Sequence, residues 1–354
     1  MKNNKLPLPH LVYNQLKNLP EASRPLLRAA ISLSLLSLLL WKVNLGKLKG
    51  LLLSSQWRLV LLAVLIYIGG QMLCSYKWQL LLKSLGSQKR LLSLVKLYFI
   101  GMFFNLFMPT IIGGDAIRIY LASDDLEKFP QSASSVFMER STGLFALFSI
   151  AIVSSLVFPL QLGRYSISLL VLLAFLFFFF IFFILIFRPW IYNLGSKLLE
   201  QIGLRRIGNK FKEVWSTLNR YKEKKVVLGI AFVYSLIFQL LVIAVNMVNA
   251  RAMGISLSPK YFFIFIPVIA VLGMFPFTIN GIGLRETGYT ILFATVGLSS
   301  EAGLSLGLLW LAVLLLSSLP GGLFYLFLRR RRIEIKKTNH NPETDLPKED
   351  NHAQ

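Results

Sequence analysis

PTIIGGDAIR, residues 109–118, interrupts an apolar part of the chain with a proline, two glycines and two charged side chains. Proline and glycine both disfavour a continuous helix. The apolar run before Pro109 has about 12 residues, too few to cross a hydrocarbon core of about 30 Å. The stretch therefore predicts a break in a membrane segment, with Asp115 and Arg118 three residues apart beside the break.

The composition predicts a membrane protein. Of 354 residues, 55% are hydrophobic and 15% are charged, and the mean hydropathy is +0.63. Soluble domains are far less apolar. Several runs approach the length of about 20 apolar residues that a spanning helix needs. We predict an all-α polytopic membrane protein with about 6–8 transmembrane helices.

The apolar runs divide the chain into three regions. Residues 1–25 are expected to form a cytoplasmic N-terminal segment, 26–328 the transmembrane domain, and 329–354 a basic, polar, disordered cytoplasmic tail. Two runs are short, and they end at Pro109 and Pro276. The expected apolar helices are 26–41, 59–76, 97–108, 142–160, 167–187, 226–248, 261–275, 287–297 and 304–328.

The distribution of Lys and Arg predicts the orientation, because cytoplasmic loops retain positive charge. Basic residues gather in the N-terminal segment, between Lys77 and Lys96, between Arg188 and Lys225, and after Arg329. Both termini are therefore expected in the cytoplasm and the protein in the cytoplasmic membrane. The loop 42–58 carries four basic residues on the opposite side, so the orientation of the first helix stays open.

Residues 205–225 form a basic amphipathic segment. Apolar residues recur there at intervals of three and four, which predicts a helix with one apolar face. The helix either lies on the anionic inner leaflet or packs on the protein as an ordinary loop helix. The lipid surface also explains much of the net charge of +22, and no nucleic-acid partner is expected.

A second interrupted stretch, PFTINGIGLRE at residues 276–286, echoes the first. A gapless alignment pairs Pro109 with Pro276 and Arg118 with Arg285. With cytoplasmic termini, the two short runs enter from opposite sides of the membrane. Paired short, Pro/Gly-interrupted segments mark the midplane site of inverted-repeat transporters. The sequence thus predicts two re-entrant hairpins and an inverted repeat; chance similarity of two loops is the alternative.

The two stretches supply the candidate substrate-binding residues. Glycines permit a tight reversal, and the half-helix that follows directs N–H groups and a positive dipole end toward an anion. Each arginine adds a fork suited to phosphate. In the alternative interpretation, Asp115 caps its helix and forms an ion pair with Arg118. The candidates are Arg118, Arg285, Gly113, Gly114, Asp115, Asn280, Gly281 and Gly283.

Three further charged residues are candidates for a gate or proton relay. Glu139 and Arg140 are expected at the mouth of the span 142–160, and Glu286 follows Arg285. Charges in or near the hydrocarbon face the protein interior and mark pathways. Internal ion pairing of the glutamates with Arg140, Arg118 or Arg285 is the alternative.

Three motifs in this order resemble the lysylphosphatidylglycerol synthase transmembrane-domain family, also described as flippase-like. They are residues 103–123, 134–147 and 276–322, and the resemblance covers roughly 26–328. Many relatives have Asp-Arg where this chain has Glu139 and Arg140. The first motif has the form N-x-x-x-P-x-x-x-G-G-D-x-x-R, matched by Asn105, Pro109, Gly113, Gly114, Asp115 and Arg118.

The resemblance implies a function in lipid translocation. Members fused to a C-terminal aminoacyl-transferase domain make and translocate aminoacylated phosphatidylglycerol, and others work with glycosyltransferases or lipid pathways. No such domain follows residue 328 in this sequence, so the stand-alone translocation half is implied. The expected partners are membrane lipids with an anionic headgroup and a separately encoded lipid-modifying transferase.

Two other functions stay open at this point. The first is an intramembrane enzyme acting on a lipid phosphate or prenyl diphosphate, with Asp124, Asp125 and Glu127 as a Mg²⁺ site; a solvated acidic loop is the alternative there. The second is a non-catalytic membrane partner of a transferase. No P-loop occurs and all three histidines lie in the polar tails, so we expect no catalytic residue, cofactor or metal.

Overall fold

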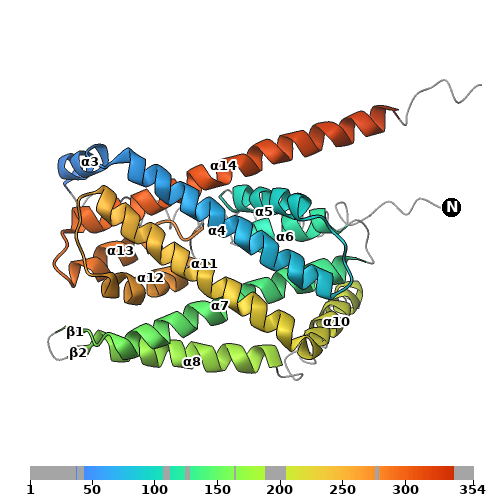
Figure 1. The fold of residues 1–354 in the computed structure, drawn as a ribbon, viewed down its shortest axis with the longest axis horizontal. Helices are drawn as coiled ribbons and strands as arrows, with labels where there is room; N and C mark the ends of the chain where they lie inside the picture. Colours follow the sequence, from blue (N-terminus) through green and yellow to red (C-terminus); the bar gives the residue numbers. More distant parts are fainter. Residues whose placement is uncertain are drawn as a thin grey trace, which may run out of the picture.

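The structure is a computed structural model that describes residues 37, 44–106, 112–123, 128–162, 165–187, 205–275, 278 and 280–338. These residues form 11 α-helices, one 3₁₀ helix and two short strands (Figure 1). The expected helix 26–41 and the acidic loop 124–127 lie outside the described residues. The helices are α3 Leu45–Leu53, α4 Trp57–Ser84, α5 Leu91–Asn105, α6 Ile112–Ala122, α7 Phe129–Val157, α8 Ile167–Phe187, α10 Arg205–Asn219, η1 Arg220–Glu223, α11 Lys225–Ala252, α12 Pro259–Met274, α13 Leu284–Ala294 and α14 Ser300–Thr338.

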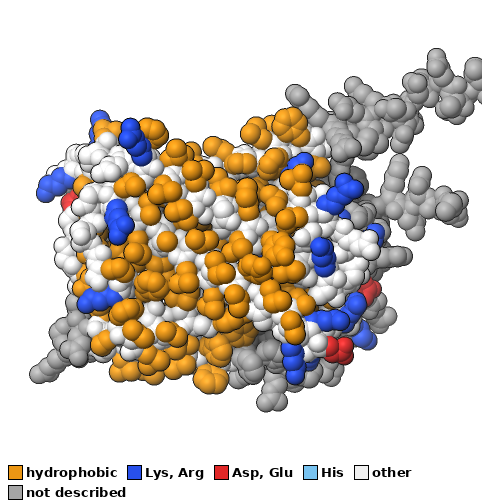
Figure 2. All heavy atoms as spheres, viewed as in Figure 1, with side chains coloured by type: hydrophobic (Ala, Val, Ile, Leu, Met, Phe, Trp, Pro, Cys, Tyr) orange, Lys and Arg blue, Asp and Glu red, His pale blue; other side chains and the backbone are white. Residues whose placement is uncertain are grey.

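Four helices are long and apolar enough to cross a membrane. They are α4, α7, α11 and residues Ser300–Leu328 of α14, with 28 or 29 residues each. At a rise of about 1.5 Å per residue they extend for about 42 Å. Leu91–Asn105, Ser168–Ile181 and Pro259–Met274 are shorter apolar helices. Apolar side chains cover the middle of the molecule, and basic side chains gather toward its two ends (Figure 2).

Two groups of four helices follow one another in the same order of lengths. The helices α4, α5, α6 and α7 have 28, 15, 11 and 29 residues. The helices α11, α12 and α13 have 28, 16 and 11 residues, and the apolar part of α14 has 29. Between the groups, β1 (Gln161–Leu162) pairs antiparallel with β2 (Tyr165–Ser166) and joins α7 to α8.

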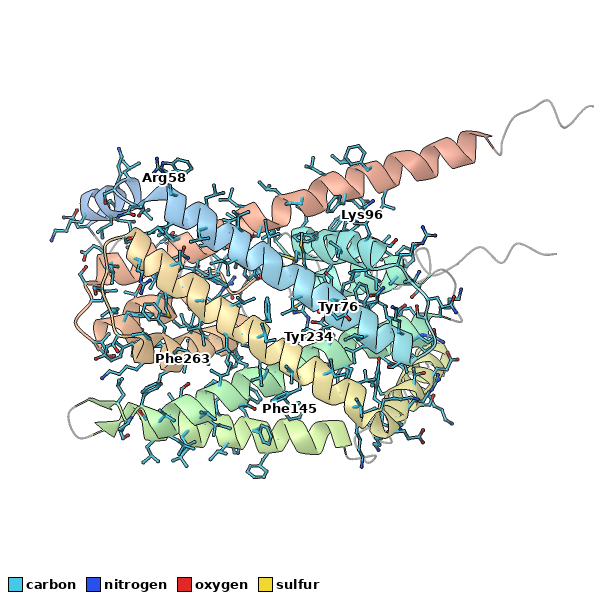
Figure 3. The ribbon with its side chains drawn as sticks, in the orientation of Figure 1. Arg58, Tyr76, Lys96, Phe145, Tyr234 and Phe263 are labelled. Atoms are coloured by element: carbon cyan, nitrogen blue, oxygen red, sulfur yellow. The ribbon has the colours of Figure 1, made fainter. Side chains whose placement is uncertain are left out.

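The helices α4 and α11 pack along each other in opposite directions. The N–H of Gln56, before α4, donates to the carbonyl of Ala252 at the end of α11, at 2.8 Å. Halfway along, the rings of Tyr76 and Tyr234 meet edge to face with centroids 5.5 Å apart (Figure 3). The first helices of the two groups therefore run antiparallel.

Each group contains a pair of short helices that fold back on each other. In the pair α5–α6, a Cβ atom on Gly114 would lie 2.0 Å from the carbonyl oxygen of Gly101. In the pair α12–α13, a Cβ atom on Gly281 would lie 2.7 Å from the Cα atom of Gly273. Glycine permits these approaches because it has no side chain. The two pairs lie in opposite halves of the molecule (Figure 1).

The helix α14 packs against both pairs. Near its start, a Cβ atom on Gly303 would lie 2.9 Å from the Cα atom of Thr290 in α13. Farther along, a Cβ atom on Gly321 would lie 1.9 Å from the carbonyl oxygen of Phe99 in α5. Small residues let helix backbones approach closely in membranes, so this one helix connects the two halves.

Most of the expected helices are present, with shifted ends. The expected spans 167–187, 226–248, 261–275 and 287–297 correspond to α8, α11, α12 and α13 within a few residues. Three expectations are wrong by more. The helix α4 continues to Ser84 instead of residue 76, α5 begins at Leu91 instead of 97, and α7 begins at Phe129 instead of 142. All three errors have one cause: each of these helices contains charged side chains, and the search for apolar runs stopped at them.

The two basic segments also differ in detail from expectation. The helix α14 continues to Thr338, so the first ten residues of the expected disordered tail are helical. No Pro or Gly lies between Gly322 and Thr338 to stop the helix. The amphipathic segment forms α10 and η1. The hydroxyl of Ser134 in α7 donates to the carbonyl of Val214 at 2.9 Å, so α10 packs on the protein as one of the two alternatives expected.

Candidate functional site: charges at two helical hairpins

We call Asn105 and residues 113–118, where α5 and α6 meet, the first tip. The side-chain oxygen of Asn105 accepts a 2.8 Å hydrogen bond from the N–H of Gly114. This bond satisfies one of the free N–H groups at the start of α6. Asn105 thereby fixes the close contact between the two helices, and α6 presents Asp115 and Arg118 to its neighbours.

Arg118 is held inside the protein by charge and by aromatic rings. Its side chain is 1% exposed. The Nη2 atom donates to Oε2 of Glu139 at 2.7 Å and lies 3.3 Å from a carboxylate oxygen of Asp115. The guanidinium carbon lies 4.6 Å from the ring centroid of Trp78 and 4.5 Å from that of Tyr98. Cation–π contacts of this kind strengthen when they are desolvated.

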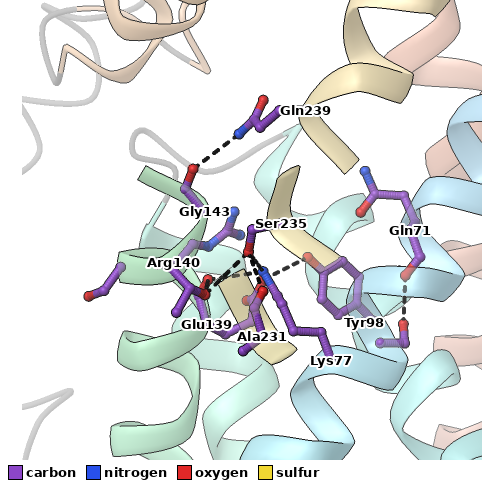
Figure 4. A network of polar contacts seen from close by, with 12 residues as sticks. Gln71, Lys77, Tyr98, Glu139, Arg140, Gly143, Ala231, Ser235 and Gln239 are labelled. Atoms are coloured by element: carbon purple, nitrogen blue, oxygen red, sulfur yellow. Dashed lines mark hydrogen bonds and ion pairs between the residues drawn. The ribbon is translucent and has the colours of Figure 1, made fainter. Parts of the chain in front are cut away.

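Glu139 of α7 collects contacts from three other helices, and part of this network is drawn in Figure 4. In addition to Arg118 of α6, Nζ of Lys77 in α4 lies 3.2 Å from its Oε1. The hydroxyl of Tyr98 in α5 donates to the same oxygen at 3.4 Å. Lys77 also donates to the carbonyl of Glu139 at 3.1 Å and to the hydroxyl of Ser235 in α11 at 3.0 Å. Every group around Glu139 is therefore a donor or a cation.

Arg140 points away from Glu139 and toward the first tip. Its Nε and Nη2 atoms each donate at 2.8 Å to an oxygen of Asp115, which is a bidentate pair. Its side chain is nevertheless 43% exposed. Arg140 is the twelfth residue of α7, about 16 Å along the helix. A partly exposed guanidinium therefore lies well inside a helix that is long enough to span a membrane.

These contacts form a network, which we call the first charge network, of Lys77, Asp115, Arg118, Glu139 and Arg140. It contains three cations and two carboxylates, so one positive charge has no counter-charge within it. Charges inside a membrane protein are costly and are retained for pairing or function. The network therefore favours a nearby anion.

We call Thr278 and residues 280–286, between α12 and α13, the second tip. Its backbone turns through left-handed conformations, with φ of 49° at Asn280, 74° at Gly281 and 90° at Gly283. Oε2 of Glu286 accepts a 2.6 Å hydrogen bond from the N–H of Gly283. The glycines thus permit the reversal, and Glu286 caps the start of α13.

The second tip contains buried polar atoms without partners. Nη2 of Arg285 donates to the carbonyl of Asn280, and Arg285 is 9% exposed. In the described part of the chain no carboxylate lies within ion-pair distance of Arg285. Among the described residues, Nε of Arg285, the hydroxyl of Thr278 and Oε1 of Glu286 are buried without a hydrogen-bond partner. Buried polar groups are almost always bonded, so these atoms point to a bound water or ligand.

Tyr67 of α4 packs its ring against Phe238 of α11 and Trp310 of α14, at centroid distances of 6.2 Å and 5.3 Å. Gln239, the next residue of α11, donates to the carbonyl of Gly143, one turn beyond Arg140, at 3.3 Å. The turn of α7 that carries Arg140 therefore lies close to the middle of α11.

The structure brings the candidate residues together in two groups. Asp115, Arg118, Glu139 and Arg140 belong to the first charge network, where Gly114 makes the close contact. Asn280, Gly281, Gly283, Arg285 and Glu286 form the second tip. The ion pair of Asp115 with Arg118 that the alternative interpretation named is present.

Two details of the sequence interpretation are wrong. Glu139 and Arg140 lie at the eleventh and twelfth residues of α7, not at its mouth. The gapless alignment suggests equivalent positions for the arginines, but Arg118 is the seventh residue of α6 and Arg285 the second of α13. The half-helices begin at different distances from their prolines.

Sequence reasoning missed Lys77, Trp78, Tyr98 and Ser235. Lys77 was counted with the cytoplasmic charges, yet it is buried within α4. The signal was the sequence WQLLL after Lys77, which continues the apolar helix. Within the described residues, no three His, Cys, Asp or Glu side chains gather in a metal-binding arrangement; the absence of a metal stays an expectation.

Long apolar helices and two helical hairpins with buried charges define an all-helical membrane protein. Residues 26–322 match the sequence model of the lysylphosphatidylglycerol synthase TM region. The chain belongs to this family of integral, multi-pass membrane proteins, and the match covers most of its length. No curated protein and no solved structure matches the chain.

Proposed function

We propose that the protein translocates a lipid with an anionic or modified headgroup, or a lipid-linked intermediate, across the cytoplasmic membrane. The observation that carries this proposal is Arg285, a buried guanidinium with an unpartnered Nε atom and no carboxylate partner among the described residues. A buried cation of this kind is stabilised by an anion. A lipid phosphate supplies that charge while its acyl chains remain in the bilayer.

In this proposal the pairs α5–α6 and α12–α13 are re-entrant hairpins. The groups α4–α7 and α11–α14 are the two halves of an inverted repeat, supported by their equal order of lengths and the antiparallel packing of α4 and α11. Substrate sites of inverted-repeat transporters lie between the repeats near the midplane. Both termini are cytoplasmic, in accord with the distribution of basic residues.

The two tips have different tasks in the proposed mechanism. The phosphate binds at the second tip, to Arg285 and the hydroxyl of Thr278. Arg140, whose side chain is partly exposed, provides a second cation for the anion. Arg118 is paired with two carboxylates and holds the first hairpin in place. One half rocks against the other to open the site to each leaflet in turn.

Glu286 is the proposed proton-relay residue. It is fully buried, and its Oε1 atom has no hydrogen-bond partner among the described residues. It follows Arg285 directly in the sequence, so a phosphate bound to Arg285 would lie near this carboxylate. Glu139, held by two cations, is proposed as a structural gate element.

Purified protein in liposomes tests the proposal. Headgroup-labelled phosphatidylglycerol or phosphatidylcholine is placed in one leaflet of the liposome. Movement of the labelled lipid to the other leaflet is measured by the fraction of label that an added reductant can reach. We expect the protein to move the anionic lipid, and Arg285→Gln to abolish the movement. The matched control is Arg251→Gln, at the exposed end of α11. Equal movement by Arg285→Gln and by the unmodified protein would overturn the proposal.

Mass spectrometry of the same liposomes separates the remaining functions. We propose that the protein carries out no covalent chemistry, so the lipids should emerge unchanged. A converted headgroup or a released phosphate would instead show an intramembrane enzyme. Movement that begins only when a transferase is supplied would show a membrane partner of that transferase.

A further inference from the structure

A crevice of about 420 Å³ lies beside the first charge network, between α7, α8, α10, η1 and α11. Ligand pockets typically have about 300–1,000 Å³, so the crevice can hold a molecule or part of one. It is separate from both tips. Its lining includes Thr142, Phe145, Phe179, Trp215, Lys222 and Gly229.

The walls of the crevice are apolar and aromatic. Phe145 of α7 and Phe179 of α8 meet edge to face with centroids 5.3 Å apart (Figure 3). Phe137 of α7, which lines the crevice, and Ile230 of α11, next to the lining residue Gly229, are exposed on the outer surface. In a membrane, this surface contacts lipid tails, so the crevice opens toward acyl chains and not toward water.

The end of the crevice at η1 is basic. Lys222 and Asn219 line it there. Between residues 212 and 225 the described side chains include five basic and two acidic groups. An anionic headgroup at this end is favoured by the same electrostatics that attract basic segments to anionic membranes. An apolar channel with a cationic end matches a phospholipid with a negative charge.

Hydrogen bonds fix the helices that form this end. The hydroxyl of Tyr221 donates to the carbonyl of Leu81 at 3.0 Å. Burial raises the pKa of the Tyr221 phenol, so the donor keeps its proton. The hydroxyl of Ser134 attaches α10 to α7. The crevice is therefore bounded by anchored elements rather than by loose loops.

The floor of the crevice is continuous with the first charge network. The hydroxyl of Thr142 donates to the carbonyl of Glu139 at 3.0 Å. The hydroxyl of Ser235 lies 3.3 Å from that of Thr142 and accepts the hydrogen bond from Lys77. Two hydroxyl groups thus separate the apolar crevice from a buried lysine.

We propose that the crevice binds one acyl chain of an anionic phospholipid, with the headgroup phosphate at Lys222. The proposal rests on the membrane placement of the protein and does not require that the bound lipid be the transported one. A lipid seated here extends along the lipid-facing side of α7 and α11, with its tail over Thr142.

Fluorescence quenching in nanodiscs tests the occupant, with phospholipids that carry bromine on the acyl chains. Trp215 lines the crevice, so its emission should be quenched. The Trp215→Phe variant measures its share of the quenched signal. If that substitution leaves the quenched fraction unchanged, no acyl chain reaches Trp215 and the proposal is overturned.

A glycine substitution tests whether the crevice itself is required. A Cβ atom on Gly229 meets no atom within 4 Å, so Gly229→Leu should fill the crevice without disturbing the helices. We expect it to remove most of the Trp215-dependent quenching. The matched control is Gly69→Leu, an exposed α4 position that also has open space around it. Equal quenching in the two variants would show that the chain lies elsewhere.

The headgroup is tested by competition between brominated phosphatidylglycerol and unlabelled phosphatidylcholine. Lys222→Gln should lower the preference for the anionic lipid by about fivefold, the factor that corresponds to about 1 kcal/mol per basic residue near the membrane surface. Lys83→Gln, an exposed lysine at the end of α4, should leave it unchanged. If Lys222→Gln lowers the quenching but leaves the preference for phosphatidylglycerol over phosphatidylcholine unchanged, the assignment of the headgroup to Lys222 is overturned.

Discussion

Arg118 in α6 and Glu139 in α7 form a 2.7 Å ion pair in which both side chains are at most 3% exposed. The pair joins a short hairpin helix to a long helix of the bundle. Each partner has further support, because Asp115 also faces Arg118 and Lys77 also faces Glu139. The position of the first hairpin therefore depends on electrostatics as well as on packing.

Removing the carboxylate of Glu139 should destabilise the protein strongly. Glu139→Gln leaves Arg118 and Lys77 buried without this counter-charge, and breaking a buried pair typically costs about 3–5 kcal/mol. Thermal unfolding in nanodiscs should show a large fall in the melting temperature. Glu223→Gln, an exposed site in η1, is the control. Equal melting temperatures would contradict the structural role of the pair.

The contact between α5 and α6 should not tolerate a methyl group. A Cβ atom at position 114 would collide with the backbone of Gly101 and the side chain of Asn105, so Gly114→Ala should cost about 1–3 kcal/mol or more. Gly143→Ala in α7, with no atom within 4 Å of its Cβ position, should be neutral or stabilising. Thermal unfolding of both variants checks this; a stable Gly114→Ala protein would refute the close approach.

The attachment of η1 should depend on one phenol. Tyr221→Phe removes the bond to Leu81 and should lower local stability by about 1 kcal/mol, the typical net value of a hydrogen bond. Hydrogen exchange should then become faster across α10. Tyr120→Phe, at an exposed side chain of α6, should leave the exchange unchanged. Unaltered exchange in Tyr221→Phe would mean that other contacts anchor the segment.

Cysteine labelling checks the proposed orientation. Cys74 is buried, so a Cys74→Ser background removes the native thiol with little loss. In intact cells, a membrane-impermeant thiol reagent should label Lys260→Cys, in the first turn of α12, and not Lys224→Cys, before α11. Permeabilised cells should show labelling of both. The reverse pattern in intact cells would place the termini outside.

The helices of this protein were largely predictable because few secondary structures are possible for a chain segment in lipid. Backbone polar groups in hydrocarbon must be bonded within a helix, so a long apolar run such as Ile167–Phe187 identifies its own element. The two interrupted stretches lie where α5 gives way to α6 and α12 to α13. Hydropathy did not predict the full length of a helix where a charged residue is neutralised by a partner far away in the sequence, as at Lys77 and Glu139. The local sequence does not reveal such a partner.

Some members of the candidate site were predictable from the sequence, but its connections were not. Pattern alone identified Asp115, Arg118, Glu139 and Arg140, but it could not show that Arg140 pairs with Asp115 and Glu139 with Arg118. The aromatic rings around Arg118 looked like ordinary core residues. Such pairings depend on how α4, α5, α6 and α7 approach one another, and this information is spread over many contacts.

The course of α14 has a mechanical consequence. Its contacts with α13 at Gly303 and with α5 at Gly321 are 18 residues apart, about 27 Å along the helix. They lie on either side of its midpoint within the bundle. If α14 tilts about that midpoint, its two halves move in opposite directions. The hairpins α12–α13 and α5–α6, which contact opposite halves of α14, would then also move in opposite directions.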